Sequence, residues 1–305
     1  MKVRKFKHRF GNDILIIAMI STVFIASCKK ENVVSQPGTK QASVVHASGS
    51  TVTTAAASTY VRQHLLFENT FENATDMNLW ATQEKAFANS IVISNTVTHT
   101  GHSSMQVLVN KTDPIVTGGI RAEVTLKQEP VVKVERWIGY SVYLPSSFII
   151  DPEPEIIQQW HDMPDLAEGG VWRSPPFALM TQNGRWSLSV RWSAARLTSD
   201  ETTAGKIYDL GRYRNSVWTN WVFHIRSAWD STGLIEVWQN GVLVLTINGP
   251  NAYNDNTGNY FKMGVYKWVW MPGKDTGTST TTSREVYYDD VRIGDQYATY
   301  KDVAP

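Results

Sequence analysis

The sequence lacks two features that would have narrowed its class at once. It has a single cysteine in 305 residues, which excludes a disulfide framework and a zinc site built from cysteines. It also has almost no net charge, with 29 Lys and Arg against 28 Asp and Glu; eight of the bases and two of the acids precede Tyr60, which leaves 21 bases and 26 acids in the rest. A nucleic-acid binder with a domain-wide positive field is therefore excluded for that part. With 42% hydrophobic and 19% charged residues, wholesale disorder is excluded too.

The N-terminus lacks an apolar run long enough to span a membrane. Five bases in the first nine residues precede the run Ile14 to Ala26, whereas a spanning helix needs about 20 apolar residues. This is the pattern of an export signal. The run ends in Ile25-Ala26-Ser27-Cys28, which resembles the cleavage box of bacterial lipoproteins, in which the cysteine becomes the lipidated first residue. An ordinary signal with an incidental cysteine is the alternative.

These features predict a division of the chain into three parts. Residues 1–27 are the lipoprotein signal peptide, residues 28–60 a flexible tether rich in Ser and Thr, and residues 61–305 the folded domain. We expect an exported bacterial lipoprotein, periplasmic or at the outer membrane or cell surface, held to the membrane by a lipid on Cys28.

The folded part lacks stretches with helical periodicity. From Val61 onward, alternating β-branched and aromatic runs bounded by Gly, Asn, Asp and Pro recur instead. Asn240-Gly241, between two such runs, predicts a hairpin with a type I′ turn. The predicted strands cover residues 90–94, 104–110, 119–127, 135–144, 185–192, 221–228, 234–239, 242–248, 260–268 and 285–293. About 245 residues with so many strands predict a single all-β domain, a β-sandwich or jelly roll.

One predicted strand, residues 260–268, has a polar face of unusual composition. A two-residue period places the apolar residues Phe261, Met263 and Val265 on the core side. We expect the other face to be exposed and Gly264 to leave room for a ligand on the strand. That face comprises Tyr260, Lys262, Gly264, Tyr266 and Trp268, and Lys267 is the exception on the apolar side. An ordinary solvated strand face is the alternative interpretation.

Two shorter segments have the same character. Gln159 and His161 share a face of one segment. Arg121 and Glu123 share a face of another, against Ile120 and alternating apolar residues. A structural histidine and a surface ion pair of little energetic value are the alternatives.

Together, the three segments resemble a known motif set. Arg-x-Glu, Gln-x-His and Tyr-Phe-Lys-x-Gly-x-Tyr, in this order, are similar to the motif trio of jelly-roll alginate lyases. The last two also resemble heparin lyase I and the fungal glucuronan lyases, and residues 287–294 resemble the closing strand of this lectin-like superfamily. Thr125 stands where alginate lyases have a second Arg, and Lys267-Trp268 where they have Asn-Gln, so the heparin lyase I-like branch is the better analogy. The resemblance implies a β-jelly roll, a concanavalin A-like two-sheet sandwich with a substrate groove on its concave sheet.

The resemblance also implies a reaction. A polysaccharide lyase removes the proton on the carbon that bears a uronic acid's carboxylate and expels the glycosidic oxygen by β-elimination. Gln159 and Arg121 would stabilise the charge that builds on the carboxyl group. His161 suits the base, since an unperturbed histidine has a pKa of about 6.5. Tyr266 would protonate the departing oxygen, or serve as both base and acid if elimination is syn.

Substrate binding is assigned to residues that flank these four. Lys262 would bind a neighbouring anionic group as a point charge. Residues 173–226 hold eight bases and three acids, from which a local positive groove is expected. The substrate-binding set is Lys262, Glu123, Tyr260, Trp268, Lys267, Arg191 and Arg173.

The expected partner is an anionic, uronic-acid-containing polysaccharide, with no nucleic acid, and the protein is expected to be a monomer. No cofactor is required for the chemistry. A structural calcium ion is considered in two places, the acidic run Asp151 to Glu168, otherwise interpreted as a solvated loop, or Asp289 and Asp290 with Glu68.

Two other functions compete with a lyase. A retaining glycoside hydrolase would need two carboxylates about 5 Å apart. Asp151-Pro-Glu153-Pro-Glu155 offers alternating acids, but its prolines remove donors from the sheet ladder. A non-catalytic carbohydrate-binding module explains the fold and the aromatic residues but leaves Gln159, His161 and Tyr266 as coincidences. The sequence therefore predicts an enzyme, a polysaccharide lyase.

Overall fold

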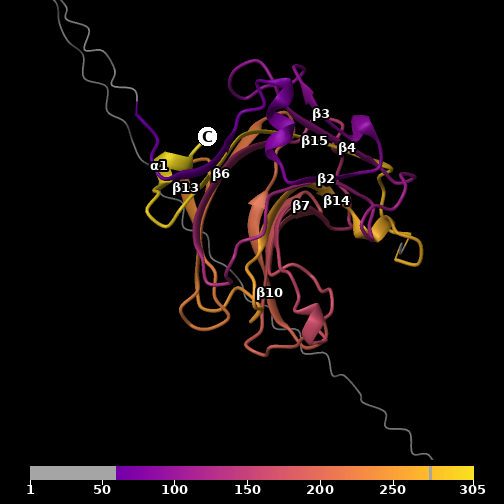
Figure 1. The fold of residues 1–305 in the computed structure, drawn as a ribbon. Coiled ribbons are helices and arrows are strands. Elements are labelled where there is room, and N and C mark those ends of the chain that lie inside the picture. Colours follow the sequence, from indigo (N-terminus) through magenta and orange to yellow (C-terminus); the bar gives the residue numbers. More distant parts are fainter. Residues whose placement is uncertain (1–59, 275–276) are drawn as a thin grey trace, which may run out of the picture. The chain divides into compact units, whose positions relative to one another are not determined.

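The computed structural model describes residues 60–274 and 277–305 (Figure 1). The predicted signal peptide, the predicted lipidation site Cys28 and all but the last residue of the predicted tether lie outside the described residues. Within the described ranges, none of the helices combines the length and the apolar character needed to span a bilayer.

Two antiparallel sheets form the fold. Sheet A runs in the order β13 (Val242–Asn248), β12 (Leu234–Gln239), β11 (Trp218–Arg226), β6 (Glu135–Tyr143), β15 (Ser283–Gly294), β4 (Ser104–Asn110) and β3 (Ile91–Ser94), with β1 (Leu65–Asn69) paired to β15. Sheet B runs in the order β10 (Ala204–Arg212), β9 (Arg185–Trp192), β8 (Phe177–Gln182), β7 (Glu155–His161), β14 (Tyr260–Tyr266), β5 (Arg121–Thr125) and β2 (Thr82–Lys85). In Figure 1, β13 and β6 lie to the left and β7, β14 and β10 towards the middle. The prediction of an all-β jelly roll is confirmed.

Helical structure is sparse among the described residues. One α-helix, α1 (Tyr300–Val303), follows β15. The 3-10 turns are η1 (Ala74–Leu79), η2 (Ala88–Ser90), η3 (Leu166–Glu168) and η4 (Trp268–Trp270). The last of these follows β14 directly, so it ends the strand that carries the Tyr-Phe-Lys-x-Gly-x-Tyr motif.

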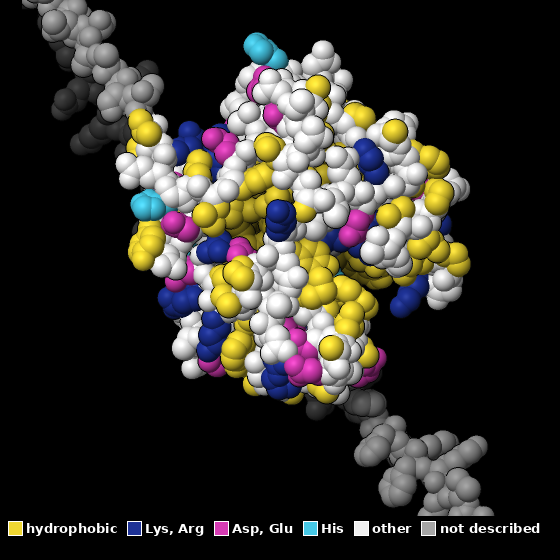
Figure 2. Space-filling view, viewed as in Figure 1, with side chains coloured by type: hydrophobic (Ala, Val, Ile, Leu, Met, Phe, Trp, Pro, Cys, Tyr) yellow, Lys and Arg dark blue, Asp and Glu magenta, His cyan; other side chains and the backbone are white. Residues whose placement is uncertain are grey.

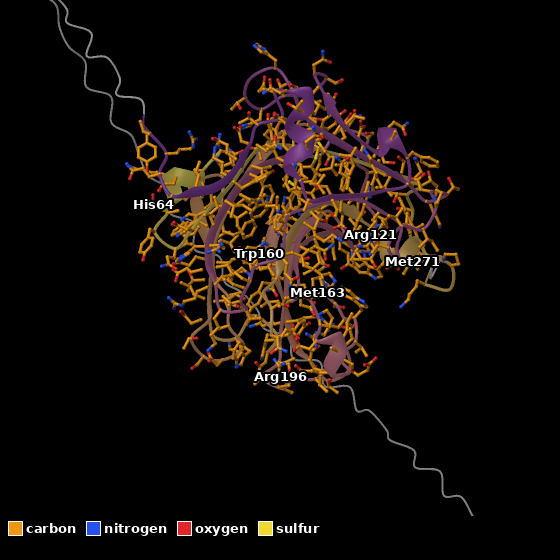
Figure 3. All side chains as sticks on the ribbon, viewed as in Figure 1. His64, Arg121, Trp160, Met163, Arg196 and Met271 are labelled. Atoms are coloured by element: carbon orange, nitrogen blue, oxygen red, sulfur yellow. The ribbon has the colours of Figure 1, made fainter. Side chains whose placement is uncertain are left out.

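The core lies between the sheets and follows the alternation seen in the sequence. On β14, Phe261, Met263 and Val265 are buried against the apolar residues of sheet A. On β7, Trp160 turns into the same core, and Figure 3 places it near the middle of the molecule. Because successive side chains of a strand point to opposite faces, this fixes the outward direction of Gln159, His161 and Tyr266.

Most predicted strands coincide with observed ones. β4, β9, β12 and β13 have the predicted bounds, and Asn240 and Gly241 have φ values of 49° and 83°, as a type I′ turn requires. The predicted strands did not include β1, β2, β7, β8 and β10, although the faces of Gln159 and His161 on β7 were predicted from a two-residue period. β2 and β8 lack a clean polar-apolar alternation, because β2 is short and polar and β8 is buried on both faces except at its last residue.

Gly264 has a different role from the expected one. Its φ is +141°, and a Cβ there would overlap the carbonyl oxygen of Ala122 and lie 2.8 Å from Cα of Glu123. The missing side chain therefore allows β5 to approach, and the expectation that it makes room for a ligand is wrong. The register between β14 and β7 shifts at this point, and the hydroxyl of Tyr288 lies 2.8 Å from the carbonyl oxygens of both Gly264 and Ile157. A side chain of sheet A thus holds the irregular part of both motif strands.

Candidate active site

A groove of about 790 Å³ lies on the face of sheet B that points away from the core. Its lining comes from β2, β5, β7, β8, β9, β10 and β14 and from the loops around them. Arg121 and Met271, both lining residues, lie on the same side of the molecule in Figure 3. The predicted site residues in the lining are Arg121, His161, Arg173, Arg191, Tyr260, Lys262, Tyr266 and Trp268.

The register of three strands determines which motif residues meet. Between β14 and β5, Tyr266 is opposite Arg121 and Gly264 is opposite Glu123. Between β14 and β7, Lys262 is opposite Gln159 and Tyr260 is opposite His161. The three motifs, which are far apart in the sequence, therefore form adjacent rows on one face, as their resemblance to a motif set implies.

Four charged side chains form what we call the groove cluster: Glu84, Arg121, Glu123 and Lys262. Arg121 Nη1 lies 3.1 Å from Glu123 Oε2 and 3.2 Å from Glu84 Oε2. Lys262 Nζ lies 2.8 Å from Glu84 Oε2 and 3.2 Å from Glu123 Oε2. Two cations and two carboxylates thus alternate, and the cluster is neutral overall.

Burial divides the groove cluster into a deep part and an exposed corner. Glu123 is fully buried; burial alone would raise the pKa of its carboxyl group, but Lys262 and Arg121 outweigh this and lower it. The side chain of Lys262 is only 2% exposed, whereas that of Glu84 is 17% exposed. The expectations that Lys262 presents an exposed ammonium and that Glu123 contacts substrate are therefore wrong. Glu123 instead holds Arg121 and Lys262 in place, and the ammonium of Lys262 is paired with both Glu84 and Glu123.

Gln159 joins the groove cluster through its amide. Its Nε2 donates to Glu123 Oε1 at 2.6 Å, and the side chain is fully buried. Its Oε1 has no hydrogen-bond partner within the described part of the chain. A buried amide normally has hydrogen-bond partners for both its nitrogen and its oxygen. The amide of Gln159 departs from this rule, because only its nitrogen has one.

Tyr266 lies at the Arg121 end of the groove. The guanidinium carbon of Arg121 is 3.8 Å from the centre of the phenol ring, and Trp268 packs 5.7 Å away. Burial raises the pKa of Tyr266 above its usual value, although Arg121 acts in the opposite direction. The phenol therefore keeps its proton at neutral pH beside a fixed positive charge. A Cβ on Gly119 would overlap Cε2 of Tyr266, so this glycine makes room for the ring.

His161 lies at the other end, between two aromatic rings. It stacks on Tyr260 with ring centres 5.6 Å apart and meets the edge of Trp172 at 5.7 Å. Its Nδ1 is 2.9 Å from the carbonyl oxygen of Asp162, an acceptor, which assigns the proton of a neutral imidazole to Nδ1. Nε2 is then the basic nitrogen. Among the described residues no contact joins His161 to Tyr266.

Arg173 lies behind His161 rather than in front of it. Its side chain is 1% exposed, with Nε 3.0 Å from Asp162 Oδ2 and Nη2 2.5 Å from Asp255. Asp162 in turn lies 3.1 Å from Nδ1 of His161. The assignment of Arg173 to direct substrate binding is therefore wrong, and its charge instead orients the carboxylate beside the histidine.

Lys267 occupies a second ion cluster, which we call the closed cluster: Lys267, Asp151, Glu155 and Arg284. Lys267 Nζ lies 2.9 Å from Glu155 Oε2 and 3.3 Å from Asp151 Oδ2, and Arg284 Nε lies 2.6 Å from Glu155 Oε2. All four side chains are at most 1% exposed. The assignment of Lys267 to substrate binding is wrong, because an apolar-side position turns it inward.

The closed cluster also settles two expectations about the acidic run. Asp151 and Glu155 are buried and paired with cations, so neither is available as the carboxylate of a glycoside hydrolase. For the same reason the interpretation of residues 151–168 as a solvated loop is wrong at both of these residues.

The positive groove expected from residues 173–226 is largely neutralised. Arg191 lines the groove but lies 3.1 Å from Asp200, Arg185 pairs with Asp209, and Arg196 pairs with Asp165. Figure 2 shows acidic and basic side chains mixed on the face in view. The run of bases along the sequence therefore does not become a run of free cations in space.

Two residues of the site, Glu84 and Gly119, were not predicted. Glu84 lies on β2, which is too short and polar to be recognised as a strand, and Gly119 was counted as part of a strand without a role. Trp172, 55% exposed beside His161, belongs to the loop before Arg173 and lines the groove. Only the glycine pair Gly118-Gly119 gave a signal, since adjacent glycines often mark a close approach.

The acidic residues considered for calcium have other partners. Arg292 Nε lies 2.7 Å from Glu68 and its Nη2 2.8 Å from Asp290, which also accepts from Thr100. Burial raises the pKa of Asp289 to about 6. Within residues 60–274 and 277–305, no group of three or more His, Cys, Asp or Glu side chains is arranged to hold a metal ion. A calcium ion therefore stays a prediction from the sequence.

Comparison with known proteins identifies the family. The polysaccharide lyase family model matches residues 72–292, more than half of the chain. An endo-β-1,4-glucuronan lyase from the fungus Trichoderma reesei has a similar structure, with a TM-score of 0.67 and 23% identity over 79% of this chain and 98% of that one. An alginate lyase from the marine Aplysia kurodai has a TM-score of 0.50 and 15% identity over 76% of this chain and 99% of that one. No curated protein sequence matches the chain. The chain belongs to the polysaccharide lyase family, and its fold is the jelly roll of the lyases to which it is similar.

Proposed function

We propose that this protein cleaves a non-sulfated polymer of uronic acids by β-elimination, with His161 as base and Tyr266 as acid. The observation that carries the proposal is the row arrangement in the groove, where a protonated phenol beside Arg121 and a histidine with Nδ1 anchored lie along one substrate path. A base and an acid serving one sugar approach different atoms of it, so the two side chains need no mutual contact.

The elimination assigns a fate to each proton and electron pair. Nε2 of His161 takes the proton from the carbon that bears the carboxylate, and the electron pair forms a double bond to the neighbouring carbon. The bond from that carbon to the glycosidic oxygen breaks, and the Tyr266 hydroxyl gives its proton to the departing oxygen. Arg121 stabilises the charge that develops on the carboxyl group, a contribution of about 3 kcal/mol per donor in comparable sites. Gln159 assists with the second hydrogen of Nε2, the one that is not given to Glu123.

The charge balance of the groove supports the substrate class. Arg121 and Lys262 are matched by Glu84 and Glu123, and Arg191 by Asp200. A polymer with one carboxylate per sugar suits such a neutral surface better than a heavily sulfated one, whose charge would need an excess of free cations. Glucuronan, the polymer after which the fungal lyase of similar fold is named, is the first polymer to test. The heparin lyase I-like assignment stays a prediction, and heparan sulfate and alginate belong in the same panel.

Replacement of Tyr266 by Phe tests the assignment of the acid. We expect the rate of formation of unsaturated product, followed by near-ultraviolet absorbance, to fall by at least about a hundredfold while binding of the polymer persists. Tyr297→Phe, which removes a hydroxyl from a 66% exposed ring, is the matched control. Wild-type rates in Tyr266→Phe would contradict the assignment.

His161→Ala separates the two routes of elimination. If His161 is the base, its loss removes turnover on every polymer that the enzyme cleaves. If turnover persists on a polymer of one uronic epimer, Tyr266 serves there as both base and acid. Either result is interpretable because Tyr266 and Arg121 do not contact His161 among the described residues.

We propose further that the enzyme acts as a monomeric exported lipoprotein. The support for the lipid anchor is the sequence Ile25-Ala26-Ser27-Cys28 after a basic and apolar leader. Cys28→Ser should move the protein from the membrane fraction to the soluble fraction of the bacterium. Persistence of Cys28→Ser in the membrane fraction would exclude lipid anchoring.

A further inference from the structure

Glu84 is the only member of the groove cluster that is appreciably exposed. Its side chain lines the groove, with Oε2 2.8 Å from Lys262 Nζ and 3.2 Å from Arg121 Nη1. Glu123, the other carboxylate of the cluster, contacts the same two cations from below and is fully buried. One nitrogen of each cation, Arg121 Nη1 and Lys262 Nζ, is therefore shared between the buried Glu123 and the groove-lining Glu84.

Glu84 occupies a position at which a second carboxylate destabilises the sheet. In the pairing of β2 with β5 it stands directly opposite Glu123, and like charges facing each other across a sheet are destabilising. The two cations compensate for this, but Glu123, held by the Gln159 amide, already provides them with a buried acceptor on the deep side. β2 is the edge strand of sheet B, so Glu84 is attached to an element with one neighbour only.

We propose that Glu84 is an internal competitor for the carboxylate of the substrate and thereby a specificity-determining residue. Its carboxylate contacts Arg121 Nη1 and Lys262 Nζ from the groove side, so an anion that approaches these two nitrogens must displace it or bind against its charge. The inference rests on the proposed function, in that the competing group is a sugar carboxylate in this groove.

The negative charge of Glu84 also acts on other residues that line the groove. Its charge contributes to the raised pKa values of Tyr260 and Tyr266, after the larger contribution of burial. A negative charge that acts on two phenols of the groove also acts on a carboxylate bound between them. Glu84 thus lowers the affinity for polyanions in general, and most for those with the highest charge density.

Glu84→Gln tests the competition, since the amide keeps the size of the side chain and removes its charge. We expect the affinity for a polyuronate, measured by calorimetry in the Tyr266→Phe background, to rise roughly tenfold, because a like charge is removed from the binding site. In the catalytically intact background KM should fall without a fall in kcat. Heparin should inhibit Glu84→Gln more strongly than wild type.

Glu129→Gln is the matched control for overall charge. Glu129 is 19% exposed, pairs with Arg136 at 2.7 Å and does not line the groove. The Glu129→Gln variant should bind the polyuronate with the same affinity as the wild type. Glu84→Asp keeps the charge and should bind the polymer close to the wild-type affinity, and Glu84→Ala repeats the charge removal if the amide variant does not fold.

The direction of the change decides the outcome. A structural role for Glu84 predicts weaker binding and a lower kcat for Glu84→Gln and Glu84→Ala, because the cations would lose their position. Weaker or unchanged binding in both variants, or a rise equal to that in Glu129→Gln, overturns the proposal. Binding of polyuronate is measured without turnover, so a wild-type protein that binds but does not eliminate would refute the proposed reaction and leave this result standing.

Discussion

Lys262 and Lys267 lie five residues apart, and each sits between two carboxylates, yet their surroundings differ. The closed cluster around Lys267 has all four charged side chains at most 1% exposed. The groove cluster around Lys262 has the exposed corner Glu84 and the unpaired oxygen of Gln159 beside it. Similar ion pairs therefore serve two purposes. In the closed cluster, every charge is paired and buried, and the ion pairs stabilise the fold. In the groove cluster, pairing is incomplete, so polar groups remain available to a substrate.

The largest expected effect comes from breaking the closed cluster. Lys267→Met leaves Asp151 and Glu155 buried with one cation fewer, which should cost about 3–5 kcal/mol of unfolding free energy. Lys262→Met should cost clearly less, because Glu84 can turn to solvent. Chemical denaturation measures both, with the exposed Lys127→Met as control. Equal losses for Lys262→Met and Lys267→Met would remove the distinction between the clusters.

The second largest effect is expected on catalysis and concerns Gln159, whose amide lies beside the groove cluster. Gln159→Leu should lower kcat about 10²- to 10³-fold, since it removes the Nε2 group whose second hydrogen is proposed to stabilise the developing charge. Gln158→Leu is its neighbour in sequence and points to the core, where both of its amide atoms lack partners within the described chain. Steady-state kinetics of the two variants are compared, and similar losses of kcat would mean that general packing, rather than the groove, is responsible.

The contribution of the closed cluster to the free energy of unfolding should decrease at acidic pH. Burial would raise the pKa of Asp151, but hydrogen bonds from Thr281, the Glu153 amide and Ser279, together with Lys267, lower it from 3.8 to about 2. A lowered native pKa stabilises the fold above pH 4, and the stabilisation is lost as the pH falls through the native value. Asp151→Asn should therefore be less stable than wild type by about 2 kcal/mol at pH 7. Urea unfolding should show this difference shrinking between pH 4 and pH 2, and a constant difference would contradict the assignment.

The smallest expected effect is that of salt on substrate binding. Because the groove cations are already paired, an increase from about 0.05 to about 0.5 M salt should weaken polyuronate binding less than tenfold. Calorimetry at several salt concentrations measures this. A loss of a hundredfold would mean that free cations dominate the groove, and salt-indifferent binding would point to a neutral glycan.

The sequence predicted the parts of the fold that depend on local alternation. Strands such as β12, the Asn240-Gly241 turn and the outward direction of Gln159 and His161 follow from a two-residue period. The pairing of charges did not follow. Arg121 meets Glu84, 37 residues away, on a strand of four polar residues, and Arg173 meets Asp255, 82 residues away. Such partners are set by topology, so the exposure of Lys262, Lys267 and Arg173 could not be judged from their own segments.

The central claim is that the groove carries out elimination on a polyuronate, and the most direct measurement records two signals from the same digest. Purified wild-type protein is incubated with glucuronan, alginate and heparan sulfate, and near-ultraviolet absorbance and new reducing ends are measured together. We predict that on at least one non-sulfated polymer both signals rise in equal molar amounts, since each elimination gives one unsaturated sugar and one reducing end. Reducing ends without absorbance would show hydrolysis, and the absence of both signals on every polyuronate would contradict the account.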